Sequence, residues 1–276
     1  MMIKKIIHIA DVHIRNFLRL EEYGEQFMNL FKRISDEIQG LEHDEIRIVI
    51  CGDLVHQKNN ISNELMAMTS CFIRDLEKYG NVIVVAGNHD LVVNNMARKD
   101  TLTSLFQTAQ FNHSTFIDYD LSYQSGCMFD DNVIWALYSI YDDYEKPNIS
   151  KIRKDNPESI IIGLYHGMVV GAKLYDGSSV DSGVNKNIFK GCDCVIAGDI
   201  HKQQEVNITK ENKLVYSGSL IQQNFGESVS NHGFVSWDVP TLEHKFVNLQ
   251  PNAPLYKIKI SSIDDIENDK EVFLNL

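Results

Sequence analysis

Five short runs of apolar, β-branched residues each end in side chains that can ligate a metal. The runs cover residues 6–9, 46–50, 82–85, 160–164 and 195–197, and each is typical of a buried strand. The fragments that follow them are Asp11-Val12-His13, Gly52-Asp53, Gly87-Asn88-His89-Asp90, His166 and Gly198-Asp199-Ile200-His201. In an α/β sheet, ligands bind beyond the carboxyl ends of the strands. We therefore expect the five fragments to meet at one site.

Helical periodicity fills the spaces between the first three runs. Apolar residues recur at helical spacing after the first fragment, at Tyr23, Phe27, Leu30, Phe31, Ile34 and Ile38. Ser62 is the expected N-cap of a second helix, which Gly80-Asn81 ends. Residues 1–86 therefore predict the order β-α-β-α-β of a mostly parallel, helix-covered sheet.

The second half of the chain is richer in short strands. Candidates cover residues 114–117, 133–137, 206–208, 214–216, 234–239 and 245–249, which predicts a second sheet packed on the first. Residues 167–192 form a long connection rich in Gly, Ser and Asn, and connections of that length are often functional. Pro251 and Pro254 mark a change of character before a new alternating run, so we divide the chain into domains 1–249 and 250–276.

Composition narrows the class of protein. The formal net charge of −12 argues against general nucleic-acid binding, although carboxylates that face metal ions would account for part of it. Five scattered cysteines do not form a secreted disulfide framework and favour the cytosol or, in a eukaryote, the nucleus. No apolar run approaches the roughly 18 residues that cross a bilayer, so no membrane role is expected.

The five fragments together offer carboxylate, amide and imidazole donors. The candidate ligands are Asp11, His13, Asp53, Asn88, His166, Asp199 and His201. A carboxylate can bridge two ions, and Asp53 at its glycine turn is our candidate bridge. Such a mixed oxygen and nitrogen set suits Mn, Fe, Zn or Ni better than Ca or Mg. Each fragment alone also fits an ordinary turn or surface residue, but five in order predict a two-metal site.

The ordered set D-x-H, G-D, G-N-H-D, H and G-x-x-H resembles the calcineurin-type metallophosphoesterase superfamily over residues 3–248. Further stretches resemble the SbcD-type DNA double-strand-break repair nucleases: residues 8–13, 52–56, 216–220, 225–227 and 232–234. The resemblance implies an α/β fold, a four-layer α/β/β/α metallophosphoesterase sandwich. Residues 250–276 would begin a C-terminal capping domain.

The resemblance also implies roles for individual residues. It places two divalent ions, usually Mn²⁺, with Asp11, His13, Asp53 and His201 on the first and Asp53, Asn88, His166 and Asp199 on the second. His89 would be the catalytic histidine that binds no metal, and His56 would orient substrate or help processive exonuclease action. Asp90 would either orient His89 or cap its loop. The family usually has G-H-x-H where this chain has Asp199, which would ligate directly or through water.

These roles predict a metal-dependent DNA nuclease, an exonuclease or endonuclease acting in DNA break repair or recombination. By resemblance, its partners are DNA and an SMC-like ATPase of the SbcC type, and it forms a homodimer. Arg15, Lys58 and Lys173 either contact DNA phosphates or carry ordinary surface charge. Two alternatives stay open: a phosphodiesterase or phosphatase acting on nucleotides or phosphoproteins, and a non-catalytic scaffold that has lost its metals.

Overall fold

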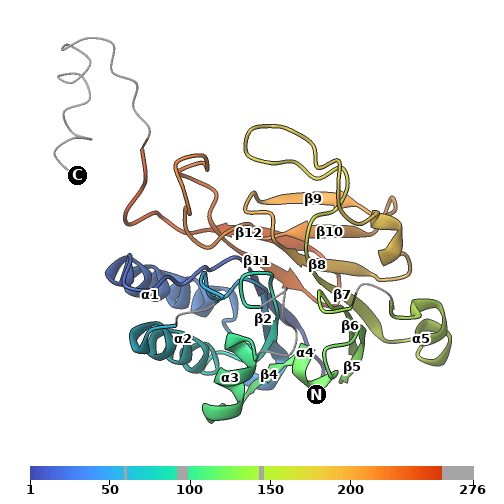
Figure 1. The fold of residues 1–276 in the computed structure, drawn as a ribbon. Coiled ribbons are helices and arrows are strands. Elements are labelled where there is room, and N and C mark those ends of the chain that lie inside the picture. Colours follow the sequence, from blue (N-terminus) through green and yellow to red (C-terminus); the bar gives the residue numbers. More distant parts are fainter. Residues whose placement is uncertain (59–60, 92–98, 143–145, 257–276) are drawn as a thin grey trace.

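Two six-stranded mixed sheets packed face to face form the centre of the fold (Figure 1). The computed structural model describes residues 1–58, 61–91, 99–142 and 146–256. The layer between the sheets is a dry core of large apolar side chains, among them Val49, Trp135, Ile196 and Trp237. The predicted layered sandwich of two sheets is therefore confirmed.

The first sheet has the strand order β12-β11-β1-β2-β3-β4. Its strands are β1 (Lys5–Ile9), β2 (Ile46–Cys51), β3 (Asn81–Val85), β4 (Ser114–Phe116), β11 (Gly233–Asp238) and β12 (His244–Asn248). Strands β1 to β4 run parallel, whereas β11 pairs antiparallel with β1, and β12 with β11. The parallel strands therefore deliver their carboxyl ends to one edge of the sandwich.

The second sheet has the strand order β5-β6-β7-β8-β10-β9. Its strands are β5 (Gly126–Asp130), β6 (Val133–Tyr138), β7 (Ile160–His166), β8 (Cys194–Gly198), β9 (Gln204–Asn207) and β10 (Lys213–Tyr216). The four central strands run parallel, and β5 and β9 close the edges antiparallel. The carboxyl ends of β7 and β8 therefore lie together at one edge of their sheet, as those of β1 to β3 do in the first sheet.

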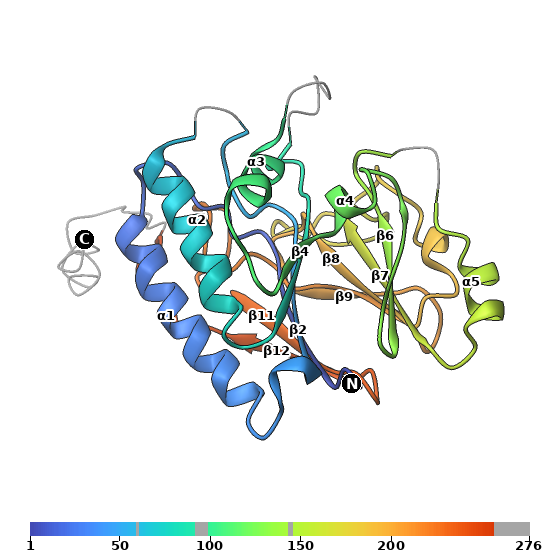
Figure 2. The same cartoon turned by 90° about the horizontal axis from the view of Figure 1, so that it is seen from below.

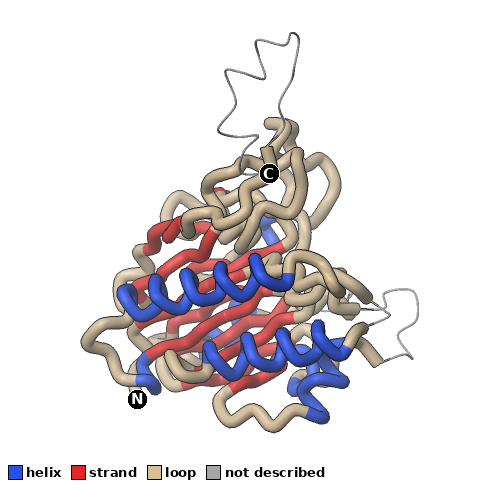
Figure 3. The backbone as a smooth tube through the Cα atoms, turned by 90° about the vertical axis from the view of Figure 1, so that its left-hand side faces the viewer, coloured by secondary structure: helices blue, strands red, loops and turns tan. Residues whose placement is uncertain are grey.

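Helices cover the outer face of the first sheet, as the periodicity predicted (Figures 2 and 3). They are α1 (Leu20–Glu37), α2 (Asn63–Leu76) and α3 (Thr101–Thr108). The Ser62 hydroxyl accepts a hydrogen bond from the Leu65 backbone N–H at 3.1 Å, which confirms this residue as the N-cap. The short 3₁₀ helix η1 (His43–Glu45) precedes β2.

The outer face of the second sheet has a thinner cover. Helix α5 (Ile149–Asp155), the 3₁₀ helix η2 (Lys186–Phe189) and the long connection between β7 and β8 supply it. Val169, Ala172 and Val180 from that connection are buried with residues of the sheet. The fourth layer is therefore largely irregular chain, because this connection packs on the sheet in place of long helices.

Several elements differ from the sequence prediction. Strand β5 and helices α3 and α5 were not predicted, and Ile117 begins helix α4 (Ile117–Asp120) instead of ending a strand. Of the expected capping domain, residues 257–276 lie outside the described residues. None of the helices in the described part of the chain combines the length and the apolar composition that a membrane-spanning helix requires.

Candidate metal centre

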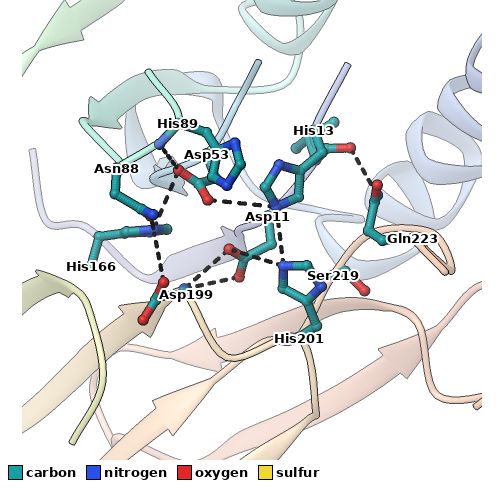
Figure 4. A network of polar contacts seen from close by, with 12 residues as sticks. Asp11, His13, Asp53, Asn88, His89, His166, Asp199, His201, Ser219 and Gln223 are labelled. Atoms are coloured by element: carbon teal, nitrogen blue, oxygen red, sulfur yellow. Dashed lines mark hydrogen bonds and ion pairs between the residues drawn. The ribbon is translucent and has the colours of Figure 1, made fainter. Parts of the chain in front are cut away.

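The seven predicted ligands converge where the two sheets meet (Figure 4). Asp11, His13, Asp53 and Asn88 follow strands β1, β2 and β3 of the first sheet, and His166, Asp199 and His201 come from the ends of β7 and β8 in the second. The convergence follows from topology, because parallel strands bring their carboxyl ends to a common edge. Each sheet therefore contributes part of one site.

The backbone at these strand ends is unusual. Asp11, His13, Asp53 and Asp199 have φ angles of 51°, 52°, 53° and 90°, in the left-handed region that residues other than glycine rarely adopt. Such conformations cost on the order of 1–3 kcal/mol each and cluster at functional sites. These four positions lie within four residues of the ends of β1, β2 and β8, where the candidate ligands stand.

Two glycines make room for the convergence. A Cβ atom on Gly87 would lie 2.2 Å from the Asp53 Oδ1 atom, and one on Gly52 would lie 2.0 Å from the His166 Nδ1 atom. Gly52 also has a φ of 84°. Any side chain at these two positions would displace a candidate ligand, so the glycines belong to the architecture of the site.

One set of donors surrounds His13. Its Nε2 atom lies 3.0 Å from the His201 Nε2 atom and 3.5 Å from the Asp53 Oδ2 atom. The Asp11 Oδ1 atom lies 3.9 Å from the His201 Nε2 atom. Donor atoms of Asp11, His13 and His201 all lie within 4.8 Å of one another. Two imidazole nitrogens and two carboxylates at these separations match the donor set expected for the first ion.

A second set surrounds His166. Its Nε2 atom lies 3.1 Å from the Asn88 Oδ1 atom, 3.4 Å from the Asp53 Oδ1 atom and 3.9 Å from the Asp199 Oδ1 atom. The two oxygens of Asp53 therefore face the two sets separately, as a bridging carboxylate would require. The Asp199 backbone N–H also donates to both carboxylate oxygens of Asp11, at 3.1 Å each.

Contacts behind the histidines fix their tautomers. The His166 Nδ1 atom lies 2.9 Å from the Cys51 carbonyl oxygen, and the His201 Nδ1 atom lies 2.7 Å from the Glu227 Oε1 atom. Both partners are acceptors, so each Nδ1 carries the proton and each Nε2 lone pair faces the site. This is the arrangement in which metal-ligating histidines are held.

The electrostatics of the site favour bound cations. Burial raises the pKa of Asp11 to about 7 and also raises the pKa of Asp199. Burial alone would lower the pKa of His166 and His201, but neighbouring carboxylates outweigh it, and the pKa of His201 rises to about 9. The pKa shifts of the two aspartates reflect carboxylates buried away from water, and the pKa shifts of the two histidines reflect the carboxylates around them. The site thus buries several negative charges. Two divalent ions would neutralise them, so the residues present fit a dimetal site.

His89 lies beside the ligands and outside the two donor sets described above, although one of its ring nitrogens lies within 4.8 Å of ring nitrogens of His13 and His56. Its backbone N–H donates to the Asp53 Oδ1 atom at 2.7 Å, and its Nδ1 atom donates to the His56 carbonyl oxygen at 2.8 Å. The ring stacks on His56, with centroids 5.0 Å apart, and meets His13 edge-on. The Nε2 atom of His89 is therefore the ring nitrogen left for a substrate.

His56 and Asp90 occupy different places around this histidine. The His56 Nδ1 atom lies 3.3 Å from the His13 Nδ1 atom, and burial together with Arg15 lowers the pKa of His56 to about 4. The buried Asp90 carboxylate accepts backbone N–H groups of Val55 at 3.0 Å and Gly87 at 2.9 Å. Asp90 thus makes the contacts of a loop cap, one of the two roles predicted for it.

The structure gives separate surroundings for the three predicted DNA-contacting residues. The Arg15 guanidinium donates to the Gln223 Oε1 atom at 3.1 Å, and Lys173 donates to the Ser179 hydroxyl within its own loop. Lys58 is half-buried and precedes residues 59–60, which are not described. Arg15 therefore has a clear role within the protein, and no contact tests the role of these residues in binding DNA.

Sequence reasoning gave no individual role to Glu227. Its buried carboxylate holds His201 and also accepts the Gln223 backbone N–H at 2.9 Å and the Asn224 side-chain amide at 2.9 Å. No local spacing connects this residue with a histidine 26 positions earlier. The stretch 225–227, noted above for its resemblance, was the only signal that pointed to it.

The chain is similar to known proteins in sequence and in fold. The calcineurin-like phosphoesterase family matches residues 4–203. An uncharacterized protein of Acanthamoeba polyphaga mimivirus is 34% identical over 269 residues, which cover 94% of this chain but only 19% of that protein. The crystal structure of a dimetal phosphatase from Danio rerio is similar in fold, with a TM-score of 0.51 and 12% identity, over 87% of this chain and 93% of that one.

Proposed function

The chain belongs to the calcineurin-like phosphoesterase family, and from this premise we propose that it hydrolyses phosphodiesters of nucleotides by a two-metal mechanism. The observation that supports the proposal is the position of Asp53 between the two donor sets, with one carboxylate oxygen 3.5 Å from the His13 Nε2 atom and the other 3.4 Å from the His166 Nε2 atom. When bound, two divalent ions supply Lewis-acid activation of water and of the phosphoryl group.

Individual residues would hold the ions and donate a proton. Asp11, His13, Asp53 and His201 would hold one ion, and Asp53, Asn88, His166 and Asp199 would hold the other. Hydrolysis forms a bond from the oxygen of water to phosphorus, releases one proton of that water, and breaks the bond from phosphorus to the leaving oxygen, which gains a proton. His89, with a proton on each ring nitrogen, would donate the Nε2 proton to the leaving oxygen, because its Nδ1 atom is fixed on the His56 carbonyl oxygen and the ring cannot turn away freely.

DNA is a second candidate substrate. Two observations favour it: His56 stacks directly on His89, and the stretch around Glu227 that resembles SbcD-type nucleases supports His201. The family membership and the geometry of the candidate ligands fit smaller phosphodiesters equally well. Cleavage of DNA is therefore a proposal about the substrate alone. The expected Mn²⁺, the SMC-like ATPase partner and the homodimer are likewise predictions, which elemental analysis and light scattering of the purified protein would test.

One assay separates the candidate functions. Purified protein with Mn²⁺ is offered linear double-stranded DNA, single-stranded DNA and bis(p-nitrophenyl) phosphate. Cleavage of DNA supports the nuclease, and turnover of the aryl ester with intact DNA supports the small-substrate phosphodiesterase. His89→Ala is expected to abolish either activity while both ions stay bound in elemental analysis. Wild-type protein that binds no metal and cleaves none of the three would refute the proposal.

A further inference from the structure

A cavity of about 340 Å³ opens directly beside the candidate metal centre. Three segments enclose it: the long connection between β7 and β8, the turn that follows β8, and the loop around residues 224–227, which lie along the same edge of the sandwich (Figure 1). Asp199 and His201 form part of its wall. A phosphate held by the candidate ligands would therefore place one of its substituents in this cavity.

The lining of the cavity combines a ring with apolar and polar groups. Tyr175 and Leu174 supply apolar surface, while Asp176 and Lys202 offer an acceptor and a donor. Carboxylates outnumber ammonium groups in the wall, which disfavours a second phosphate there. An uncharged planar group with N–H and C=O edges suits this lining, and a nucleobase has this chemistry.

Tyr175 is held in place from behind. Its hydroxyl donates to the His201 carbonyl oxygen at 3.2 Å, so the ring is tied to the same turn that carries a candidate metal ligand. A fixed ring loses little freedom when a ligand stacks on it. This hydrogen bond therefore joins the wall of the cavity to the segment that carries the candidate ligand His201.

Phe225 lies in sequence between Asn224 and Gly226, which both line the cavity. Its side chain is 60% exposed. The loop that carries it is nevertheless fixed, because the Asn224 side chain accepts the Gly226 backbone N–H at 2.8 Å and donates to Glu227 at 2.9 Å. A loop held by these hydrogen bonds therefore carries a solvent-exposed aromatic side chain next to two residues that line the cavity. Stacking on a base requires such an accessible ring.

We propose that this cavity binds the nucleobase next to the scissile phosphate, with Tyr175 and Phe225 as its aromatic contacts. The proposal rests on the proposed phosphodiesterase function and gives its substrate class as nucleotidyl phosphodiesters. The 340 Å³ volume lies at the lower end of ordinary ligand pockets, which suits one base and not an extended aromatic system.

The test compares two single-stranded oligonucleotides of equal length and charge, one of thymidines and one of abasic residues. Wild-type protein with Mn²⁺ is expected to show a higher kcat/KM for the thymidine strand. Phe225→Ala is expected to reduce this preference about 5- to 150-fold, the range for loss of one base–aromatic stack. Phe225→Trp is expected to keep it. Phe129→Ala, which removes a 64% exposed phenylalanine on the edge strand β5, is the matched control and should keep it too.

A mononucleotide ester, thymidine 5′-(p-nitrophenyl) phosphate, tests whether the cavity binds the base of a free nucleotide or that of a nucleic-acid strand. Equal effects of Phe225→Ala on the ester and on the strand support a free nucleotide, and an effect on the strand alone supports nucleic acid. Equal use of thymidine and abasic strands by the wild type, or a preference that Phe225→Ala leaves intact, would overturn the proposal.

Failure of the proposed function gives a different result. If no phosphodiester is hydrolysed, the anisotropy of fluorescein-labelled strands still measures binding to the His89→Ala variant. Tighter binding of the thymidine strand, lost on adding Phe225→Ala, would support the base site without catalysis. Equal binding of both strands would refute it.

Discussion

Glu227 offers the sharpest test of the metal centre, because it contacts His201 from behind. Glu227→Gln keeps the shape of the side chain and removes its charge. The carboxylate is only 8% exposed and lies 2.7 Å from the His201 Nδ1 atom, so the pair is shielded from water. Losing such a partner typically weakens metal binding 10- to 100-fold. We therefore expect a loss of about 1.4–2.7 kcal/mol in affinity for the ion that His201 holds.

The structure also places this loss on one ion. His201 belongs to the donor set around His13, whereas His166 is held by the Cys51 carbonyl oxygen and does not depend on Glu227. Isothermal titration with Mn²⁺ should then resolve one weakened site and one site near the wild-type affinity. The carboxylate also accepts the Gln223 backbone N–H, so urea unfolding in EDTA should accompany the titration to measure the stability of the metal-free fold.

Glu205→Gln is a matched control. Glu205 also contacts a histidine, with its Oε1 atom 3.0 Å from the His244 Nε2 atom, but it lies in strand β9 and lines a different cavity. This variant is expected to bind metal as the wild type does. Glu227→Gln with two unchanged sites would show that His201 is not oriented through its Nδ1 atom, and the reasoning about the tautomer would be refuted.

Three further perturbations test other parts of the structure. Gly87→Ala would drive a Cβ atom into Asp53 and should abolish binding of both ions in equilibrium dialysis. Gly24→Ala in α1 is the control, because a Cβ atom there meets nothing within 4 Å. It should raise the free energy of unfolding in urea by up to about 1 kcal/mol. Asp199→His replaces an oxygen donor by nitrogen and should shift the preference of the second site from Mn²⁺ towards Zn²⁺ in a competition dialysis; an unchanged preference would mean that Asp199 does not ligate. Burial lowers the pKa of His8 to about 3, below its unfolded value of 6.5, so its stabilising contribution is present above pH 6.5 and is lost as the pH falls. Between pH 7 and 5 the free energy of unfolding of the wild type, measured in urea with EDTA, should fall by about 2 kcal/mol more than that of His8→Phe. An equal fall in both proteins would contradict the buried neutral state of His8.

The local rules that predicted the fold worked where residues near in sequence decide the structure. The apolar periodicity of α1, the Ser62 cap and the β-branched runs are all satisfied within a few residues of each signal. Strand β5 escaped prediction because its residues are only partly buried at a sheet edge, where the alternation of polar and apolar residues is weak.

Prediction of the site followed the same division. Its candidate ligands stand directly after strands, so topology alone brings them together. Glu227 and the cavity around Tyr175 depend on contacts between loops more than 20 positions apart, which no local pattern encodes. The role of Asp199 also depends on distances that the order of residues does not contain.

The left-handed backbones of Asp11, His13, Asp53 and Asp199 have a consequence for the evolution of this fold. Glycine would relieve the strain at each position and would also remove the functional side chain. Stability and activity therefore select for different residues at the same four places. In a lineage released from selection for catalysis, drift to glycine or asparagine is expected there first. Relatives that keep aspartate and histidine at all four positions are then those in which selection still acts on the chemistry.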